Sequence, residues 1–221
     1  MDDDIIDLLT TKDQEQSRAR RINGLVVGII TNNNDPQRLG RVKIHFPWLS
    51  DNNETDWTRI ATIMGGKERG TFFLPEVEDE VLVGFENDDF DRPYVIGSVW
   101  SKEDSPPETN ADGKNNIRKI RSRSGHEIIF DDSDGKELVN IHTNANHTIL
   151  LDDNPGSAKV VISDKTGNNS IQIDSNQNSI TISSLLNLKI KATNIEIEAS
   201  GMMTIKAGAT LTIKGALVSI N

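Results

Sequence analysis

Two features of the sequence contain side chains that could bind metal ions: its four histidines and one aspartate-rich loop. In a threefold assembly, an inward-facing histidine would meet its two copies around the axis, and imidazole is a common zinc ligand. His126 has the same parity as Ile128 and is the candidate for that position; the other histidines are His45, His142 and His147. The loop Asp131-Asp-Ser-Asp-Gly135 is similar to the start of a calcium loop but lacks the rest of its ligand set. We interpret both features as structural and predict no metal site.

The remaining reactive residues form no recognisable catalytic pattern. Gly65-Gly-Lys-Glu-Arg-Gly70 lacks the spacing of a phosphate loop and is predicted to be a corner of a barrel. There is no cysteine, and no nucleophile-elbow motif occurs. The acidic run of residues 76–80 is expected to be a solvated loop, with an electrostatic contact to another subunit as the alternative. We therefore predict no enzymatic activity and no cofactor.

Aromatic residues and charge divide the chain into two halves. Nine of the ten aromatic residues precede position 101, and Phe130 is the last. Large aromatic side chains build globular cores, so the globular domain is expected in the first hundred residues. Residues 111–221 carry 12 basic and 12 acidic residues, so the whole net charge of −10 lies in residues 1–110. An acidic first half argues against nucleic acid as a partner, because phosphate contacts need clustered Lys and Arg.

Residues 22–100 are predicted to form a small closed β-barrel of the OB type, because five or six strands are separated by Gly- and Pro-containing turns. In the stretch 40–46, Val42, Ile44 and Phe46 should face one way, and the polar residues that alternate with them should face the other. Residues 101–116 are polar, contain two prolines and are expected to be a linker. Residues 1–21 are predicted to be an N-terminal arm, either frayed or docked on a neighbouring subunit. They lack the basic and apolar regions of a secretion signal, and no apolar run is long enough to span a membrane.

From about residue 128 onward, one small unit repeats: two apolar residues with one residue between them, followed by a polar gap. Successive units begin 11, 10, 11, 11, 9, 8, 7, 8, 8 and 7 residues apart. Each pair places two side chains on the same face of a short strand, and we expect the outside to be polar. Such a period over many units is typical of a stacked β-solenoid. Residues 117–221 are therefore predicted to form a β-helix needle.

An intertwined homotrimer is the arrangement that we expect for this needle. A single chain could also coil alone, but about eight residues per strand would give only a few narrow turns without aromatic filling. Three chains supply more levels and leave no free edges within the rod. The predicted trimer core consists of Ile171, Ile173, Ile180, Ile182, Leu188, Ile190, Ile195, Ile197, Met203, Ile205, Leu211, Ile213, Val218 and Ile220.

Several stretches resemble the central spike proteins of contractile injection machines, which include phage baseplate assembly protein V and VgrG-type spikes. The matching stretches are Gly24-Leu-Val, Asp35-Pro-Gln-Arg-Leu-Gly-Arg-Val-Lys-Ile-His-Phe-Pro-Trp48, Asp56-Trp-Thr-Arg-Ile-Ala61, Phe73-Leu-Pro-Glu-Val-Glu-Asp-Glu-Val-Leu-Val-Gly-Phe85, Asp91-Arg-Pro-Tyr-Val-Ile-Gly97 and Ile120-Arg-Ser-Arg-Ser-Gly-His-Glu-Ile-Ile-Phe-Asp-Asp132. The resemblance covers residues 22–221. It implies an all-β chain with an N-terminal OB-fold barrel and a C-terminal trimeric β-helix.

The resemblance also implies partners and a place in the cell. The spike would sit on a trimeric baseplate hub and carry a tip protein with Pro-Ala-Ala-Arg repeats, docked on Val218, Ser219, Ile220 and Asn221. Sheath contraction would drive the spike through a target envelope, with transient contact to the target membrane. The spike could carry effector cargo with it. Assembly would take place in the bacterial cytoplasm. The resemblance does not distinguish later release of the particle from its retention in the cell. Only the short stretch 1–21 precedes the barrel, so the hub is expected to be a separate polypeptide.

Two other functions stay open on the sequence alone. One is a polysaccharide-degrading tailspike enzyme, since β-helices can carry carboxylate pairs; the absence of aromatic residues after Phe130 disfavours a sugar platform. The other is an OB-fold nucleic-acid adaptor, which the acidic charge disfavours. The resemblance does not distinguish a phage tail from a type VI-like device or an extracellular particle.

Overall fold

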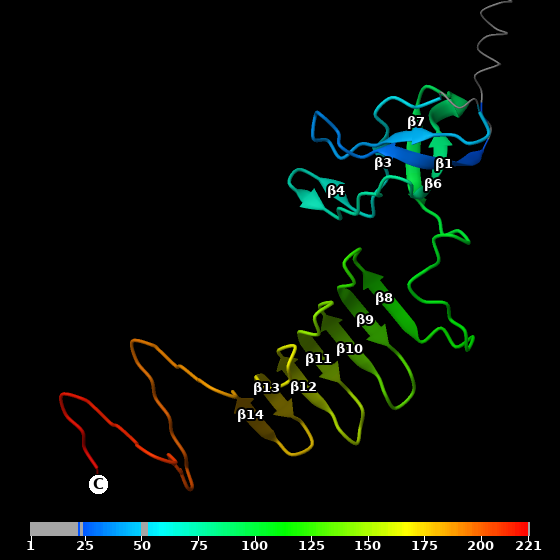
Figure 1. The fold of residues 1–221 in the computed structure, drawn as a ribbon. Coiled ribbons are helices and arrows are strands. Elements are labelled where there is room, and N and C mark those ends of the chain that lie inside the picture. The colour runs from blue at the N-terminus through cyan, green and yellow to red at the C-terminus, as the bar shows by residue number, and fades with distance from the viewer. Residues whose placement is uncertain (1–21, 23, 50–52, 221) are drawn as a thin grey trace, which may run out of the picture. The chain divides into compact units, whose positions relative to one another are not determined.

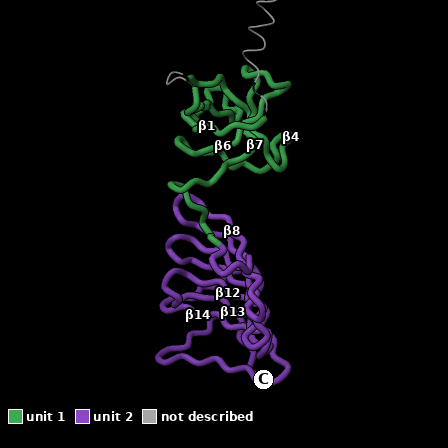
Figure 2. The backbone as a smooth tube through the Cα atoms, turned by 90° about the vertical axis from the view of Figure 1, so that its right-hand side faces the viewer, with its two compact units in different colours: residues 1–109 green, residues 110–221 purple. Residues whose placement is uncertain are grey.

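The computed structural model describes residues 22, 24–49 and 53–220, and the predicted N-terminal arm lies outside them. The chain forms two compact units, residues 1–109 and 110–221 (Figure 2). The boundary falls inside the stretch predicted to be a linker.

The first unit is a small β-barrel (Figure 1). Its elements are β1 (Leu25–Asn32), β2 (Lys43–His45), β3 (Arg59–Ile60), β4 (Gly65–Gly66), β5 (Arg69–Gly70), β6 (Glu80–Phe85), the 3-10 helix η1 (Glu86–Asp88) and β7 (Pro93–Ser98). Five strands pair in the order β2-β1-β6-β7-β3, and the β3–β7 pair is parallel. Val42 and Thr58 then join the two outer strands through reciprocal backbone hydrogen bonds of 3.0 and 2.7 Å. The sheet thereby closes on itself, as an OB barrel requires.

The barrel core is complete within one chain. Seven side chains are fully buried: Ile30, Val42, Ile44, Phe46, Val81, Val83 and Val95. The predicted common face of Val42, Ile44 and Phe46 is therefore confirmed, and it faces the core. Phe46 also packs its ring 5.9 Å from Phe85 and 5.7 Å from Phe90, between ring centroids. Gly28 of β1 lets the chain approach this cluster, because a Cβ atom there would overlap a methyl carbon of Ile44.

The second unit is a seven-stranded antiparallel sheet in which each strand pairs with the next along the chain (Figure 1). The strands are β8 (Ile117–Arg121), β9 (Glu127–Asp131), β10 (Leu138–His142), β11 (Thr148–Asp152), β12 (Lys159–Ser163), β13 (Ser170–Asp174) and β14 (Ser179–Ser183). Every pair matches five residues to five without a bulge. The apolar pairs up to residue 182 therefore form strands, as predicted.

Aspartate residues begin the turns that follow β9, β11 and β13. Asp131, Asp152 and Asp174 are each the last residue of their strand, and each side chain accepts a hydrogen bond from the backbone N–H two residues later, at 2.9–3.0 Å. An aspartate carboxylate that caps its own turn is a common turn-forming device. Asp131-Asp-Ser-Asp-Gly135 is accordingly a turn, with Gly135 at φ 70°.

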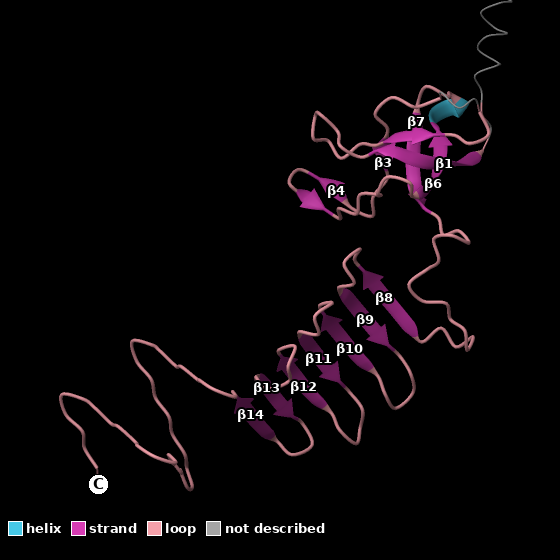
Figure 3. Cartoon of the chain, viewed as in Figure 1, coloured by secondary structure: helices cyan, strands magenta, loops and turns pink. Residues whose placement is uncertain are grey.

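Residues 184–220 contain no strand, and Figure 3 draws them as loop. This differs from the prediction, which placed five further apolar pairs on strands there. A strand requires a neighbouring backbone as hydrogen-bond partner. Successive apolar pairs also begin closer together here than in the preceding sheet, which leaves little chain for a turn between two strands of the same length.

Candidate functional surfaces

One face of the seven-stranded sheet carries two continuous rows of apolar side chains, which we call the apolar face. The cross-strand register aligns the first row as Ile120, Ile128, Ile141, Ile149, Ile162, Ile171 and Ile182. The second row consists of Phe130, Val139, Leu151, Val160, Ile173 and Ile180. The structure thus brings four predicted trimer-core residues together: Ile171 and Ile173 from β13, Ile180 and Ile182 from β14.

The apolar face is open to solvent in a single chain. Ten of its thirteen side chains are between 40% and 70% exposed. A contiguous apolar surface of this length marks an interaction site, because monomeric proteins rarely expose one. Among the described residues of the second unit, the apolar face is therefore the best candidate for an interaction surface.

The later predicted core residues are also exposed but lie outside any strand. Their exposed fractions range from 47% at Met203 to 87% at Ile220, and the others are Leu188, Ile190, Ile195, Ile197, Ile205, Leu211, Ile213 and Val218. Among the residues proposed to dock a tip protein, Val218 is 48% exposed and Ser219 is exposed as well. Asn221 lies outside the described residues.

The opposite face of the sheet is mainly polar and contains one buried carboxylate. Glu127 is 9% exposed and lies 3.6 Å from Lys119, 3.4 Å from Arg121 and 3.3 Å from His142 (nitrogen to oxygen). Three basic side chains around one buried carboxylate compensate its desolvation. The sequence could not reveal this cluster, because its members come from three strands.

The expectation of a polar outside is wrong at five positions of that face, all half-buried: Ile117, Ile129, Leu138, Leu150 and Val161. Ile129, Leu150 and Val161 occupy its middle row. Leu150 and Val161 are direct cross-strand partners, so each covers part of the other. The side-chain oxygen of Asn140, the row neighbour of Ile129 and Leu150, is buried and has no hydrogen-bond partner among the described residues.

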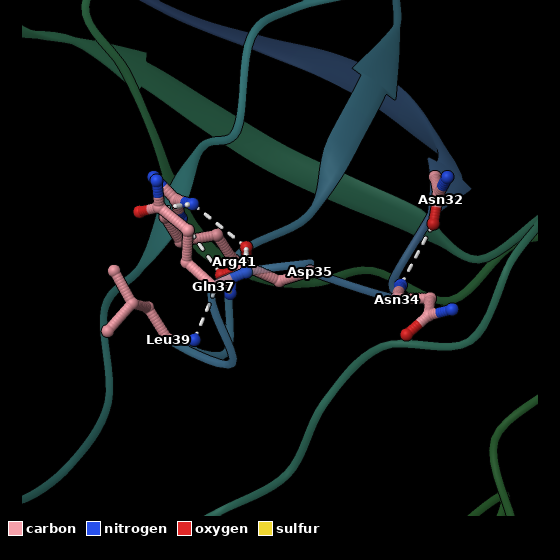
Figure 4. Close-up of polar contacts among 6 residues, drawn as sticks. All are labelled: Asn32, Asn34, Asp35, Gln37, Leu39 and Arg41. Carbon is pink, nitrogen blue, oxygen red and sulfur yellow. Dashed lines mark hydrogen bonds and ion pairs between the residues drawn. The ribbon is translucent and has the colours of Figure 1, made fainter.

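A single aspartate organises the loop that follows β1 in the barrel (Figure 4). The Asp35 carboxylate is 7% exposed and accepts hydrogen bonds from the backbone N–H groups of Gln37 and Leu39, both at 3.0 Å. Arg41 donates to both of its oxygens, at 2.9 and 2.8 Å. The hydrogen bonds from Arg41 and from these backbone groups hold the pKa of Asp35 well below its usual range. The hydrogen bonds to Asp35 thus fix the conformation of the loop Asp-Pro-Gln-Arg-Leu-Gly-Arg. Within this loop, Gly40 lies in the left-handed region at φ 69°.

The barrel also carries an open apolar groove that the sequence analysis missed. Its cavity of about 350 Å³ lies between the β4–β5 hairpin flanks and the ends of β3 and β7. Phe72 and Phe73 are 75% and 70% exposed on its wall, and Ile63 is 93% exposed. Two adjacent phenylalanines after a glycine-rich hairpin were the available signal. The predicted barrel corner at residues 65–70 is this hairpin.

The rings of His45 and His126 take part in local hydrogen bonds. His45 Nδ1 lies 3.0 Å from the carbonyl oxygen of Asn53, and His126 Nδ1 accepts a hydrogen bond of 3.2 Å from the N–H of Asn144. Across residues 22, 24–49 and 53–220, no group of three or more metal-ligating side chains is assembled. Within the same described part of the chain, no helix has the length and hydropathy that a membrane span requires.

Comparison with known proteins shows what the barrel is similar to. Residues 26–100 match the family model of the type VI secretion system and phage-baseplate injector OB domain. The chain is 34% identical over 116 residues to the type VI secretion system spike protein VgrG1a of Pseudomonas aeruginosa. The aligned region covers 48% of this chain and 18% of that protein. It is 33% identical over 112 residues to the spike protein VgrG3 of Vibrio cholerae, covering 47% of this chain and 11% of the relative.

A third relative carries a toxin name. The chain is 34% identical over 111 residues to the actin cross-linking toxin VgrG1 of Vibrio cholerae. The aligned region covers 47% of this chain and 10% of the toxin. This chain therefore spans between 10% and 18% of the length of these three relatives. The barrel is therefore similar to the injector OB domain of type VI secretion systems and phage baseplates, and the resemblance of the chain to VgrG-type spike proteins is confirmed.

Proposed function

We propose that three copies of this chain form the central spike of a contractile, phage-tail-like injection system. The observation that carries the proposal is the apolar face, which lies on a chain whose barrel is similar to the injector OB domain. In the proposed spike the three apolar faces line a common interior. Covering the exposed half of each isoleucine would contribute about 1 kcal/mol per side chain before the entropy costs of association.

The residues after β14 support three intertwined chains in that part of the needle. Residues 184–220 keep the apolar pairs but form no ladder within the chain. In the proposed trimer, their backbone hydrogen bonds are made with the neighbouring copies. The part of the needle up to β14 would then consist of three sheets, each folded from one chain. In the part formed by residues 184–220, strands would pair only between chains.

The mass of the purified chain in solution tests the trimer. Light scattering should give three times the 24.4 kDa of one chain. A sandwich of two sheets would also cover the apolar faces but would give only twice the mass of one chain. A mass of one or two chains at micromolar concentration would overturn the trimer.

The place of the trimer in the machine is part of the same proposal. The spike would sit on a separate baseplate hub, carry a tip protein with Pro-Ala-Ala-Arg repeats on Val218, Ser219, Ile220 and Asn221, and cross a target envelope when the sheath contracts. Assembly is proposed to take place in the bacterial cytoplasm. The exposure of Val218 and Ile220 supports the docking of an apolar partner. Ile220→Asp should abolish capture of such a tip protein by the trimer, and unchanged capture would contradict this docking site.

A further inference from the structure

The two ends of the seven-stranded sheet, where its turns lie, differ in charge. Because neighbouring strands are antiparallel, successive turns alternate between the ends. One end, which we call the histidine end, consists of residues 121–127, 142–148 and 163–170. The other, which we call the acidic end, consists of residues 131–138, 152–159 and 174–179.

The acidic end has a strong excess of negative charge. It holds two lysines and seven carboxylates, which are Asp131, Asp132, Asp134, Glu137, Asp152, Asp153 and Asp174. The histidine end holds three cations, two carboxylates and three histidines, which are Arg121, Arg123, Lys165, Glu127, Asp164, His126, His142 and His147. The formal charges at neutral histidine are therefore −5 and +1.

The two carboxylates of the histidine end are already engaged within the chain. Glu127 is enclosed by its three basic neighbours, as described above. Asp164 accepts hydrogen bonds from Asn169 Nδ2 at 2.8 Å and from Thr166 Oγ1 at 2.9 Å. The hydrogen bond from Asn169 is the main cause that lowers the pKa of Asp164 to about 2.

Part of the acidic excess has a local explanation and part does not. Asp131, Asp152 and Asp174 cap their own turns, and Asp132 forms an ion pair with Arg118. Asp134 and Asp153 are exposed in turns at this end, and no such capping role accounts for them. Their charge adds to a field that would repel a second acidic surface and attract a basic one.

We propose that the acidic end of each sheet docks on the histidine end of the next copy of this chain. The inference rests on the proposed trimer. A threefold rotation axis that runs along the direction in which the strands stack brings unlike ends together, because contacts around a threefold axis are heterologous. With the apolar faces turned inward, the two ends meet at the corners between neighbouring sheets. The opposite charges then favour the closed arrangement and fix which end meets which.

Charge reversal tests this docking with three variants of the full chain. The first reverses the acidic end (Asp134→Lys with Asp153→Lys), the second reverses the histidine end (Arg123→Glu with Lys165→Glu), and the third combines all four changes. All four positions are exposed and lie in turns outside the apolar rows, so circular dichroism should show an unchanged strand content. The readout is the rate at which trimer reforms after dilution from urea.

Each single-end reversal places like charges at every contact and should slow trimer formation by about tenfold at about 0.1 M salt. The effect should shrink at about 1 M salt, where the Debye length falls to roughly 3 Å. The combined variant again has unlike ends and should recover to within about twofold of the unmodified chain. Single reversals without effect, or a combined variant that does not recover, would overturn the docking and leave the trimer standing. An unmodified chain that forms no trimer would overturn the proposed function itself.

Discussion

The two units of this chain solve the problem of burying apolar residues in different ways. In the barrel, seven apolar side chains have no exposed surface in a single chain. In the seven-stranded sheet, ten of the thirteen side chains of the apolar face remain at least 40% exposed. The barrel thus buries its core within a single chain, whereas the seven-stranded sheet leaves its apolar face open. The predictions below test this difference, from the largest expected effect to the smallest.

A charged residue at a predicted needle-core position should have the largest effect. Ile197→Asp would place three carboxylates at one level of the trimer axis, where each costs several kcal/mol unless its pKa shifts strongly. Light scattering should then show loss of the trimer. The matched control is Glu198→Asp, which keeps the charge at the adjacent position and should keep the mass of the unmodified chain. Equal tolerance of the two changes would contradict the register that places Ile197 inward.

Truncation of the buried aromatic ring should affect the barrel alone. Phe46→Ala removes a fully buried side chain and should lower the free energy of unfolding of the barrel by about 3–5 kcal/mol, as large-to-small core changes do. The measurement is chemical denaturation followed by tryptophan fluorescence, since all three tryptophans precede residue 101.

Phe72→Ala is the matched control for this change, because Phe72 is 75% exposed. It should change the stability by less than about 0.5 kcal/mol. If both variants were destabilised alike, the barrel would also depend on contacts beyond its own chain, and the contrast between the two units would fail.

The smallest expected effect concerns pH. The folded-state pKa of Asp35 is lowered, chiefly by Arg41, so the folded barrel binds fewer protons than the unfolded chain at acidic pH. Its contribution to stability is present above the unfolded pKa of about 3.9 and is lost as the pH falls below that value. The melting temperature of the barrel should therefore fall between about pH 5 and pH 2.

Asp35→Asn should lower the melting temperature at neutral pH and flatten its fall at acidic pH. Glu103→Gln, at an exposed position in the stretch after the barrel strands, serves as the control and should leave the pH profile unchanged. An Asp35→Asn variant with the full acid sensitivity of the unmodified chain would show that other carboxylates carry it.

Local patterns in the sequence predicted the elements of the fold that depend on neighbours in the chain. The alternation of Val42, Ile44 and Phe46 identified a strand with one apolar face, and the apolar pairs identified strands up to Ile182. The same pattern continues to Val218 and Ile220, yet residues 184–220 form no strand in one chain. Periodicity reports which face is apolar, but a ladder also needs a partner, and the sequence does not say which chain supplies it.

Side-chain contacts that depend on the path of the backbone in space were beyond the sequence analysis. The turn signal near Pro36 was visible, but the enclosure of the Asp35 carboxylate by Arg41 depends on the path of the loop in space. Likewise, Lys119, Glu127 and His142 meet because three strands stand in one register. The charge difference between the two ends of the sheet emerges in the same way, once the topology assigns each turn to one end.

The regular register of the sheet also makes its length modular. The turns at residues 122–126, 143–147 and 164–169 recur about every 21 residues on the same side. Duplication of one such two-strand unit would return the chain to the same side and lengthen the sheet by about 9.5 Å, twice the spacing between strands. Duplication of a single strand would instead reverse the direction of everything that follows. A sheet of this design can therefore change length during evolution in steps of two strands without losing its apolar face.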